Sequence, residues 1–200
     1  YAYDNQPKIT KWNLTRFAEC LIPLISKNED EAIKLATEAL DKFEQNYEIK
    51  WLNMMRDKLG LYGEDKNDKN LIMELLNWMQ KNKVDYTNTF IFLMNKTIKN
   101  SEAYNNADFD LWKIKWVKRL IMFKNSNDKS IELMHSNNPM VIPRNHKIEE
   151  ALTLASNGDL TLFNKLIKIL KNPYEVNNND FAFMSPAPHS DKKYQTFCGT

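Results

Sequence analysis

Residues 29–47 read EDEAIKLATEALDKFEQNY, and this stretch indicates which class of fold the chain adopts. It opens with three acidic side chains, which interact favourably with the positive end of an α-helix. Its apolar residues then recur with the 3.6-residue period of an amphipathic helix. They are Ala32, Ile33, Ala36, Ala39, Leu40 and Phe43. The stretch therefore predicts an α-helix that buries one face.

The same period continues on both sides of this helix. On the N-terminal side, residues 7–26 predict a helix that Pro23 should kink or end early, because proline lacks the N–H that a helix interior uses. On the C-terminal side, a new helix is predicted from Tyr47 until Gly60 stops it. The further predicted helices span residues 70–82, 85–98, 111–121, 130–136, 147–156 and 160–170. Since little of the sequence alternates in the way strands require, we predict an all-α fold.

The character of the chain changes near its C-terminus. Residues 172–200 are rich in proline, asparagine and serine. Proline fixes its own φ and keeps the preceding residue out of the helical region. We therefore predict two parts, a helical part over 1–171 and an extended tail over 172–200 that ends in Cys198-Gly199-Thr200.

The composition fits a soluble globular protein. Hydrophobic residues make up 42% of the chain and aromatic residues 12%, enough to bury a sizeable core. The longest apolar runs fall far short of the roughly 20 residues of a membrane span, so no membrane partner is expected. The formal net charge is only +2 and both signs are intermixed, which disfavours a nucleic-acid partner. Two cysteines cannot form a disulfide framework, and this fits a reducing compartment.

Motifs that commonly carry chemistry are not found. Residues 65–70 read DKNDKN, but the calcium-loop match fails at the sixth and twelfth positions, so a solvated loop that leads into a helix is expected. His135, His146 and His189 are too far apart for a zinc motif. There is no glycine-rich phosphate loop and no nucleophile elbow. We therefore assign no catalytic, cofactor-binding or metal-binding residue within the 200 residues.

A less ordinary segment follows the turn at Asn138-Pro139. It places Arg144, Asn145 and His146 at the start of a predicted helix, directly after Pro143. One interpretation is a buried polar network in which Arg144 satisfies backbone carbonyls and Asn145 caps the helix. The other is contact with a ligand. The first is favoured, because caps of this kind are common at helix starts.

Large apolar side chains at helical spacing are expected to form the core rather than a cofactor site. They include Trp51, Met54, Trp78, Met79, Trp112 and Trp116. Cys20 lies on an apolar helix face and is expected to act as a small hydrophobe. Cys198 lies in the predicted tail, where an accessible thiol can be redox-active. Local features leave redox use and an incidental thiol equally open.

Five blocks, in this order, resemble one known family. They are YAYDNQP at 1–7 with Trp12-Asn13-Leu14, WLNMMRDKLGL at 51–61, DYTNTF at 85–90, NPMVIPRNHKIEEA at 138–151 and YQTFCGT at 194–200. Together they resemble the C-terminal portion of the selenoprotein O family, pseudokinase-fold enzymes that transfer AMP from ATP to protein hydroxyls. Departures such as Asn88 and Ile91 are local. The blocks extend over almost the whole chain.

The resemblance implies where the chemistry of the intact enzyme lies. In the family, the residues that hold ATP and Mg2+ precede the block at 1–7, so ATP and Mg2+ are implied for the intact enzyme and neither is expected to bind this chain alone. The chain would be the helical C-terminal portion of a kinase-like domain, inactive by itself. Its implied partners are an upstream kinase-like portion of the same protein and protein substrates with Ser, Thr or Tyr hydroxyls. Because the chain lacks an initiator Met, Tyr1 is expected to follow an internal cut.

The resemblance also singles out residues within the chain. Tyr3, Asn5, Gln6 and Pro7 lie in its first block and Arg144, Asn145 and His146 in its fourth, all as candidates for a structural motif. Cys198 occupies the position at which family members carry cysteine or selenocysteine. The implied role is a redox link to a cysteine of the upstream activation segment. Cys20 is not the implied partner.

Two other functions are kept as alternatives. The chain could act alone as a helical interaction module without catalysis, although no fixed repeat period is visible. The intact enzyme could instead transfer the γ-phosphate of ATP, which is distinguished by the phosphate that becomes bound to protein. The expected location is the cytoplasm if the protein is bacterial and the mitochondrion if it is eukaryotic.

Overall fold

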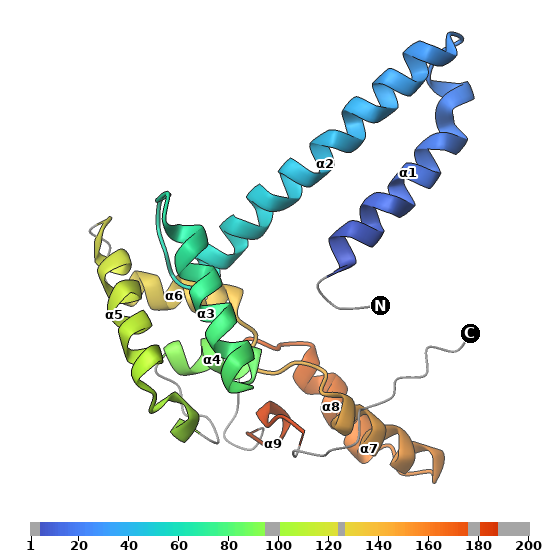
Figure 1. The fold of residues 1–200 in the computed structure, drawn as a ribbon. Helices are drawn as coiled ribbons and strands as arrows, with labels where there is room; N and C mark the ends of the chain where they lie inside the picture. The colour runs from blue at the N-terminus through green and yellow to red at the C-terminus, as the bar shows by residue number, and fades with distance from the viewer. Residues whose placement is uncertain (1–4, 95–100, 124–126, 176–180, 188–200) are drawn as a thin grey trace. The chain divides into compact units, whose positions relative to one another are not determined.

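The computed structural model describes residues 5–94, 101–123, 127–175 and 181–187, without the side chains of residues 101 and 127. Every regular element in these ranges is helical, which confirms the predicted all-α class (Figure 1). The elements are α1 (Gln6–Ile25), α2 (Glu29–Lys58), α3 (Asp68–Asn82), α4 (Tyr86–Leu93), the 3-10 helix η2 (Ser101–Tyr104), α5 (Ala107–Ile121), α6 (Asn127–Asn137), α7 (Asn145–Ser156), α8 (Thr161–Leu170) and α9 (Phe181–Met184). None of the described helices is both long and apolar enough to cross a bilayer.

The chain divides into two compact units, Tyr1–Arg56 and Asp57–Thr200. The first unit is a hairpin in which α1 and α2 run antiparallel (Figure 1). Its turn is built from short polar side chains, since Asn28 Oδ1 accepts from the backbone N–H of Glu31 at 3.1 Å and the Ser26 hydroxyl donates to the Glu31 carboxylate at 2.8 Å. The Asn28 bond satisfies a backbone donor at the start of α2 that has no partner within the helix.

Several helix boundaries differ from the sequence prediction, since α4 ends at Leu93 rather than at residue 98, and α5 and α6 begin at residues 107 and 127 rather than at 111 and 130. α2 is one helix of 30 residues, so the predicted new start at Tyr47 is wrong. No glycine or proline lies between residues 29 and 58 to interrupt the hydrogen-bond ladder, and a change of apolar face does not by itself break a helix. α1 does not end at Pro23 but continues to Ile25. Because Pro23 lies in the last turn, it removes little of the helix's hydrogen bonding.

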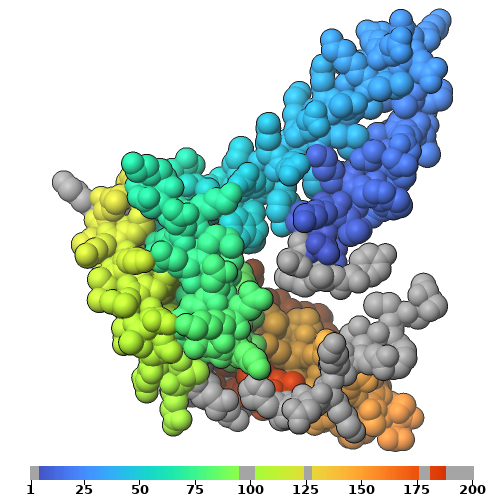
Figure 2. All heavy atoms as spheres, in the orientation of Figure 1, coloured from blue at the N-terminus to red at the C-terminus, as the bar shows by residue number. Residues whose placement is uncertain are grey.

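The core of the second unit is a row of aromatic side chains on α3 and α5. Figure 2 shows the atoms of these two helices in contact along their length. The ring centroids of Trp78 and Phe109 lie 4.5 Å apart, and those of Trp112 and Trp116 lie 5.9 Å apart and stack. Both stacked indoles also donate to backbone carbonyls, Trp112 to Leu71 at 2.8 Å and Trp116 to Leu59 at 2.9 Å. The indole N–H groups are therefore satisfied although the rings are buried.

The core prediction holds for most of its residues. Trp78, Met79, Trp112 and Trp116 are buried, as expected. Trp51 is half-buried, and Met54 keeps 44% of its surface exposed, so the prediction is wrong for Met54. Both lie on α2 in the first unit, where two helices alone provide too few neighbours to enclose a core.

The segment at 65–70 is not the fully solvated loop that its charge suggests. Asp68 is buried, and its carboxylate accepts from Arg119 Nε at 2.6 Å and Nη2 at 3.1 Å. The remaining Arg119 donors bond the carbonyls of Tyr62 and Gly63, both at 3.0 Å. One buried arginine therefore fastens the α2–α3 connection to α5.

The backbone of α6 lies so close to Gly60 that even an alanine at this position should lower the stability strongly. Gly60 has φ of +68°, and a Cβ placed there would lie 2.7 Å from the backbone oxygen of Ser130 in α6. We expect Gly60→Ala to lower the free energy of unfolding by about 3 kcal/mol, the sum of left-handed backbone strain and the steric clash. Gly158→Ala is the matched control, because φ is +89° there but no atom lies within 4 Å. It should cost only about 1 kcal/mol in urea denaturation, and equal losses for the two variants would contradict the prediction.

The C-terminal part of the second unit consists of the helix pair α7 and α8, followed by the short helix α9. α7 packs on α8, and Gly158 and Asp159 lie in the turn between them, where Gly158 is left-handed and Asp159 Oδ1 accepts from the N–H of Thr161 at 2.9 Å. The carbonyl of Pro173 then accepts from the N–H of Met140 at 2.7 Å. The predicted tail is not extended throughout, because α9 forms one helical turn. Its hydrophobic residues Phe183 and Met184 are buried, which explains why this turn is ordered against the unit.

Candidate functional site

The predicted Arg144 segment forms a bidentate ion pair with Asp85. Arg144 Nη1 lies 2.6 Å from Asp85 Oδ2, and Arg144 Nη2 lies 2.8 Å from Asp85 Oδ1. Arg144 is extended, with φ of −81° and ψ of 124°, as is usual for the residue in the N-cap position of a helix, here α7. Asp85 immediately precedes α4. The ion pair therefore joins the starts of two helices that are far apart in sequence.

Asp85 also caps the helix that it precedes. Its Oδ1 accepts from the backbone N–H of Asn88 at 2.8 Å, and its own carbonyl accepts from the Thr89 hydroxyl at 2.8 Å. The Thr89 hydroxyl lies 3.0 Å from the phenol oxygen of Tyr104. Burial raises the pKa of Tyr104 above its ordinary value, while the Thr89 hydrogen bond lowers it in part. Asp85 was not among the predicted site residues, although an aspartate at the start of a predicted helix is a recognisable N-cap signal.

Arg144 has a third partner in the C-terminal segment. Its Nη2 donates to the carbonyl of Met184 in α9 at 3.2 Å. Its Nε is buried and has no partner among the described residues. Only about a tenth of the Arg144 side chain is exposed, and both Asp85 oxygens are already occupied. The arrangement is therefore suited to fastening α4, α7 and α9 together rather than to holding a phosphate.

The other two residues of this motif take different places. Asn145 is exposed and is the first residue of α7, so the expectation that it caps this helix is wrong. The residue in the cap position is Arg144, whose side chain is engaged elsewhere. His146 is half-buried in the first turn of α7. Burial lowers the pKa of His146 below its ordinary value, and the nearby positive charges of Lys147 and Arg144 lower it further.

The lowered pKa of His146 predicts a pH effect on stability. The unfolded chain takes up a proton near the ordinary pKa of histidine, about 6.5, whereas the folded protein takes it up only at lower pH. The protein should therefore lose stability as the pH falls through and below 6.5. We expect His146→Gln to lose less stability than the unsubstituted protein between pH 7 and pH 5, measured by urea denaturation at each pH. Parallel pH profiles of the two proteins would contradict this.

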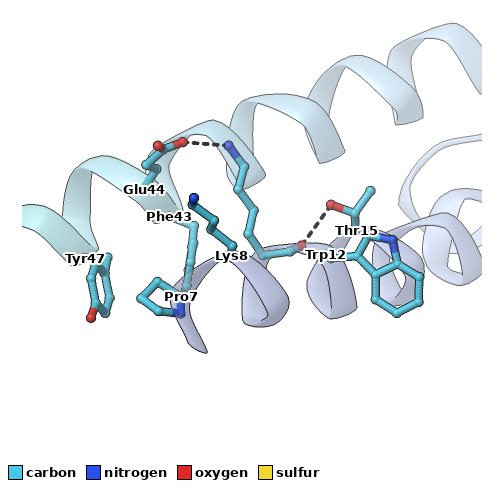
Figure 3. Close-up of a pocket in the computed structure, with 8 residues that line it drawn as sticks. Pro7, Lys8, Trp12, Thr15, Phe43, Glu44 and Tyr47 are labelled. Atoms are coloured by element: carbon cyan, nitrogen blue, oxygen red, sulfur yellow. Dashed lines mark hydrogen bonds and ion pairs between the residues drawn. The ribbon is translucent and has the colours of Figure 1, made fainter. Parts of the chain in front are cut away.

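The first-block residues lie in the other unit, at the start of α1. Asn5 and Gln6 are exposed, and Pro7 occupies the first turn of the helix, where a proline is tolerated. Pro7 lines a pocket of about 340 Å3 between α1 and α2, shown in Figure 3. An ion pair spans this pocket, with Lys11 Nζ 2.9 Å from Glu44 Oε2, and it raises the pKa of Lys11.

The remaining expected residues are placed as follows. Cys20 is exposed on α1, and its thiol donates to the carbonyl of Arg16 at 3.4 Å, so its expected role as a buried hydrophobe is wrong. Tyr3 and Cys198 lie outside the described residues. Within the described ranges, no group of three His, Cys, Asp or Glu side chains is placed to hold a metal ion.

Several proteins resemble the chain over its whole length, among them the following three. A protein nucleotidyltransferase YdiU of Pelagibacter ubique is 86% identical over 200 residues, which are all of this chain and 41% of that protein. The YdiU proteins of Alkaliphilus metalliredigens and Bacillus mycoides are 43% and 42% identical over 201 residues, with the same shares covered. The chain thus spans about two fifths of the length of these curated relatives. These relatives are named protein nucleotidyltransferases, and the chain corresponds to a part of each of them.

The family follows from a second similarity. The family model described as protein adenylyltransferase SelO matches residues 1–171. The chain therefore belongs to the SelO family of protein adenylyltransferases, which confirms the resemblance seen in its sequence blocks.

Proposed function

We propose that the full-length protein transfers AMP from ATP to Ser, Thr or Tyr hydroxyls of proteins with the help of Mg2+, and that this chain is the helical portion of its kinase-like domain. The family match over residues 1–171 supports the activity. Two arginines support the scaffold role, Arg119, which is buried, and Arg144, which is mostly enclosed. They direct their guanidinium groups to Asp68, Asp85 and backbone carbonyls. The described residues do not fit a metal site, so no step through Mg2+ is assigned to them.

The activity is tested with the full-length protein, Mg2+ and ATP labelled on either the α- or the γ-phosphate. In AMP transfer a protein hydroxyl displaces pyrophosphate from the α-phosphorus, so only the α-label should become bound to protein. The 200-residue chain alone should incorporate neither label. Incorporation of the γ-label would show phosphorylation instead, and a lack of both labels on the full-length protein would reject a transferase function.

We further propose that Cys198 is a redox thiol whose partner cysteine lies outside these 200 residues. Oxidation would join the two thiols in a disulfide, and the two electrons and two protons would pass to a small-molecule disulfide by thiol exchange. The docking of α9 supports this role, because it fixes Met184 only 14 residues before Cys198. Even a fully extended chain of that length reaches only about 50 Å from Met184.

Peptide mapping of the non-reduced full-length protein tests the redox role. It should yield a disulfide-linked peptide pair that contains Cys198 and disappears in the Cys198→Ser variant. Recovery of Cys198 only as a free thiol after treatment with oxidised glutathione would reject the proposal. We propose a cytoplasmic location, the one expected of a bacterial member of the family, and the bacterial origin of the relatives named above supports it.

A further inference from the structure

An apolar groove runs along one side of the α1–α2 hairpin. Two adjoining hollows of about 340 Å3 and 540 Å3 form it, and Phe43 and Tyr47 line both. Figure 3 shows these two aromatic side chains projecting from α2 beside the first turn of α1. Their rings stack with centroids 6.3 Å apart. The other lining residues are Pro7, Lys8, Lys11, Trp12, Thr15, Glu44, Asn46, Lys50, Trp51 and Met54.

The hairpin does not cover this groove with its own side chains. α1 has no buried residue along its 20 positions. Trp12 and Tyr47, which line the groove, are 58% and 42% exposed. A contiguous apolar surface of this kind is characteristic of a site where another element binds. Two helices also provide only one layer, whereas a stable core needs a second.

The shape of the groove fits a third helix. A groove between two antiparallel helices receives side chains at i, i+3, i+4 and i+7 of a helix that lies along it. The lining residues of α2 extend from Phe43 to Met54, which corresponds to about 17 Å along the helix axis. α1 borders only the first hollow, through residues between Pro7 and Thr15, whereas α2 alone lines the second. An occupant of about three turns would therefore fill it.

The charges at the groove define the flanks of the occupant. Lys8, Lys11 and Lys50 line it, whereas Glu44 is its one acidic residue. Glu44 pairs with Lys11, and no ion pair joins Lys8 or Lys50 to another described residue, so their charges can interact with an incoming segment. Acidic side chains beside the apolar face of the occupant would complement them.

We propose that this groove binds an amphipathic, acid-flanked helix from the kinase-like portion of the same protein that lies outside these 200 residues. The chain accounts for only 41% of the length of its relatives, so most of the polypeptide is available to supply such a segment. A segment of the same polypeptide also has a high effective concentration at the groove. This docking surface rests on the proposed function, because its occupant belongs to the kinase-like portion proposed above.

Site-specific photo-crosslinking in the full-length protein tests the occupant. Benzoylphenylalanine replaces Tyr47 in the groove or, as the matched control, Tyr174 of the second unit, which is exposed to a similar extent, 46%. Position 47 should crosslink within one molecule to a peptide from outside the 200 residues, with apolar residues at helical spacing and acidic residues beside them. Position 174 should not label that peptide.

Three results would overturn the proposal. Crosslinks from position 47 to residues 57–200 would show that the second unit covers the groove, crosslinks between two molecules would show a dimer interface, and the absence of a crosslink would show an open groove. The readout does not depend on transferase activity. A loss of AMP transfer with an intact crosslink would therefore reject the proposed function and leave the docking surface in place.

A charge reversal tests the flanks independently. In the full-length protein, Lys8→Glu combined with Lys50→Glu should speed amide hydrogen exchange of α1 by roughly three- to tenfold, because two exposed ion pairs with the occupant would be lost. The matched control combines Lys66→Glu with Lys168→Glu, two exposed lysines of the second unit, and should leave α1 unchanged. Equal exchange of α1 in both double variants would contradict the acidic flanks.

Discussion

Arg119→Met is expected to lower the free energy of unfolding by about 3–5 kcal/mol. The substitution keeps most of the apolar volume of the side chain but leaves the Asp68 carboxylate buried without its countercharge. It also removes the donors that satisfy the carbonyls of Tyr62 and Gly63. Urea denaturation followed by far-UV circular dichroism measures the loss.

Two variants distinguish this explanation from a general effect of removing a positive charge. Lys115→Met breaks an ion pair with Glu74 of 2.8 Å that is exposed on both sides, so it should cost less than about 1 kcal/mol. Adding Asp68→Asn to Arg119→Met should restore part of the stability, because the buried charge is then absent. A loss below 1 kcal/mol for Arg119→Met, or no recovery in the double variant, would show that the pair does not stabilise the fold.

Arg144→Met is expected to lower the free energy of unfolding by about 3 kcal/mol, the lower end of the range for a buried ion pair. The Asp85 side chain keeps 18% of its surface exposed, so water can partly solvate it after the substitution. The same substitution removes the hydrogen bond to the Met184 carbonyl. Cleavage of the chain near α9 by chymotrypsin should therefore become faster than in the unsubstituted protein.

The controls for Arg144 are a neighbour and a conservative variant. Lys147→Met removes an ion pair with Glu150 within the first turns of α7 and should have little effect on either readout. Arg144→Lys should recover only part of the stability, because an ammonium group cannot form the bidentate pair with Asp85. Lost stability without faster cleavage near α9 would show that Met184 is held by its hydrophobic contacts alone.

The contacts of Arg144 explain why a segment that contains the residue types of a ligand site has a structural role. Arg144, Asn145 and His146 provide a cation, an amide and an imidazole in consecutive positions, and these residue types commonly bind anions. In the structure the cation is engaged by Asp85 and Met184, the amide is exposed, and the imidazole is biased towards its neutral form by its surroundings. Such a site has no free positive group to offer a phosphate.

The sequence by itself determined the helical class, most helix positions and the family. Helical periodicity is a local property that survives in any tertiary context, which explains why residues 70–82 were predicted close to the observed α3, Asp68–Asn82. The same holds for the aromatic positions on α3 and α5, since their apolar faces are wide. The five sequence blocks carried the family, because their order along the chain is read without any structure.

Only the tertiary structure decided which polar residues are buried and what they contact. Asp68 is buried and Asp85 is mostly enclosed because they pair with Arg119 and Arg144, 51 and 59 residues away. No local feature of the sequence shows either pairing. Likewise, Phe183 and Met184 became ordered because a surface of the second unit receives them. Such contacts depend on which distant segments lie side by side in the folded chain. The local periodicity of a sequence carries no information about this.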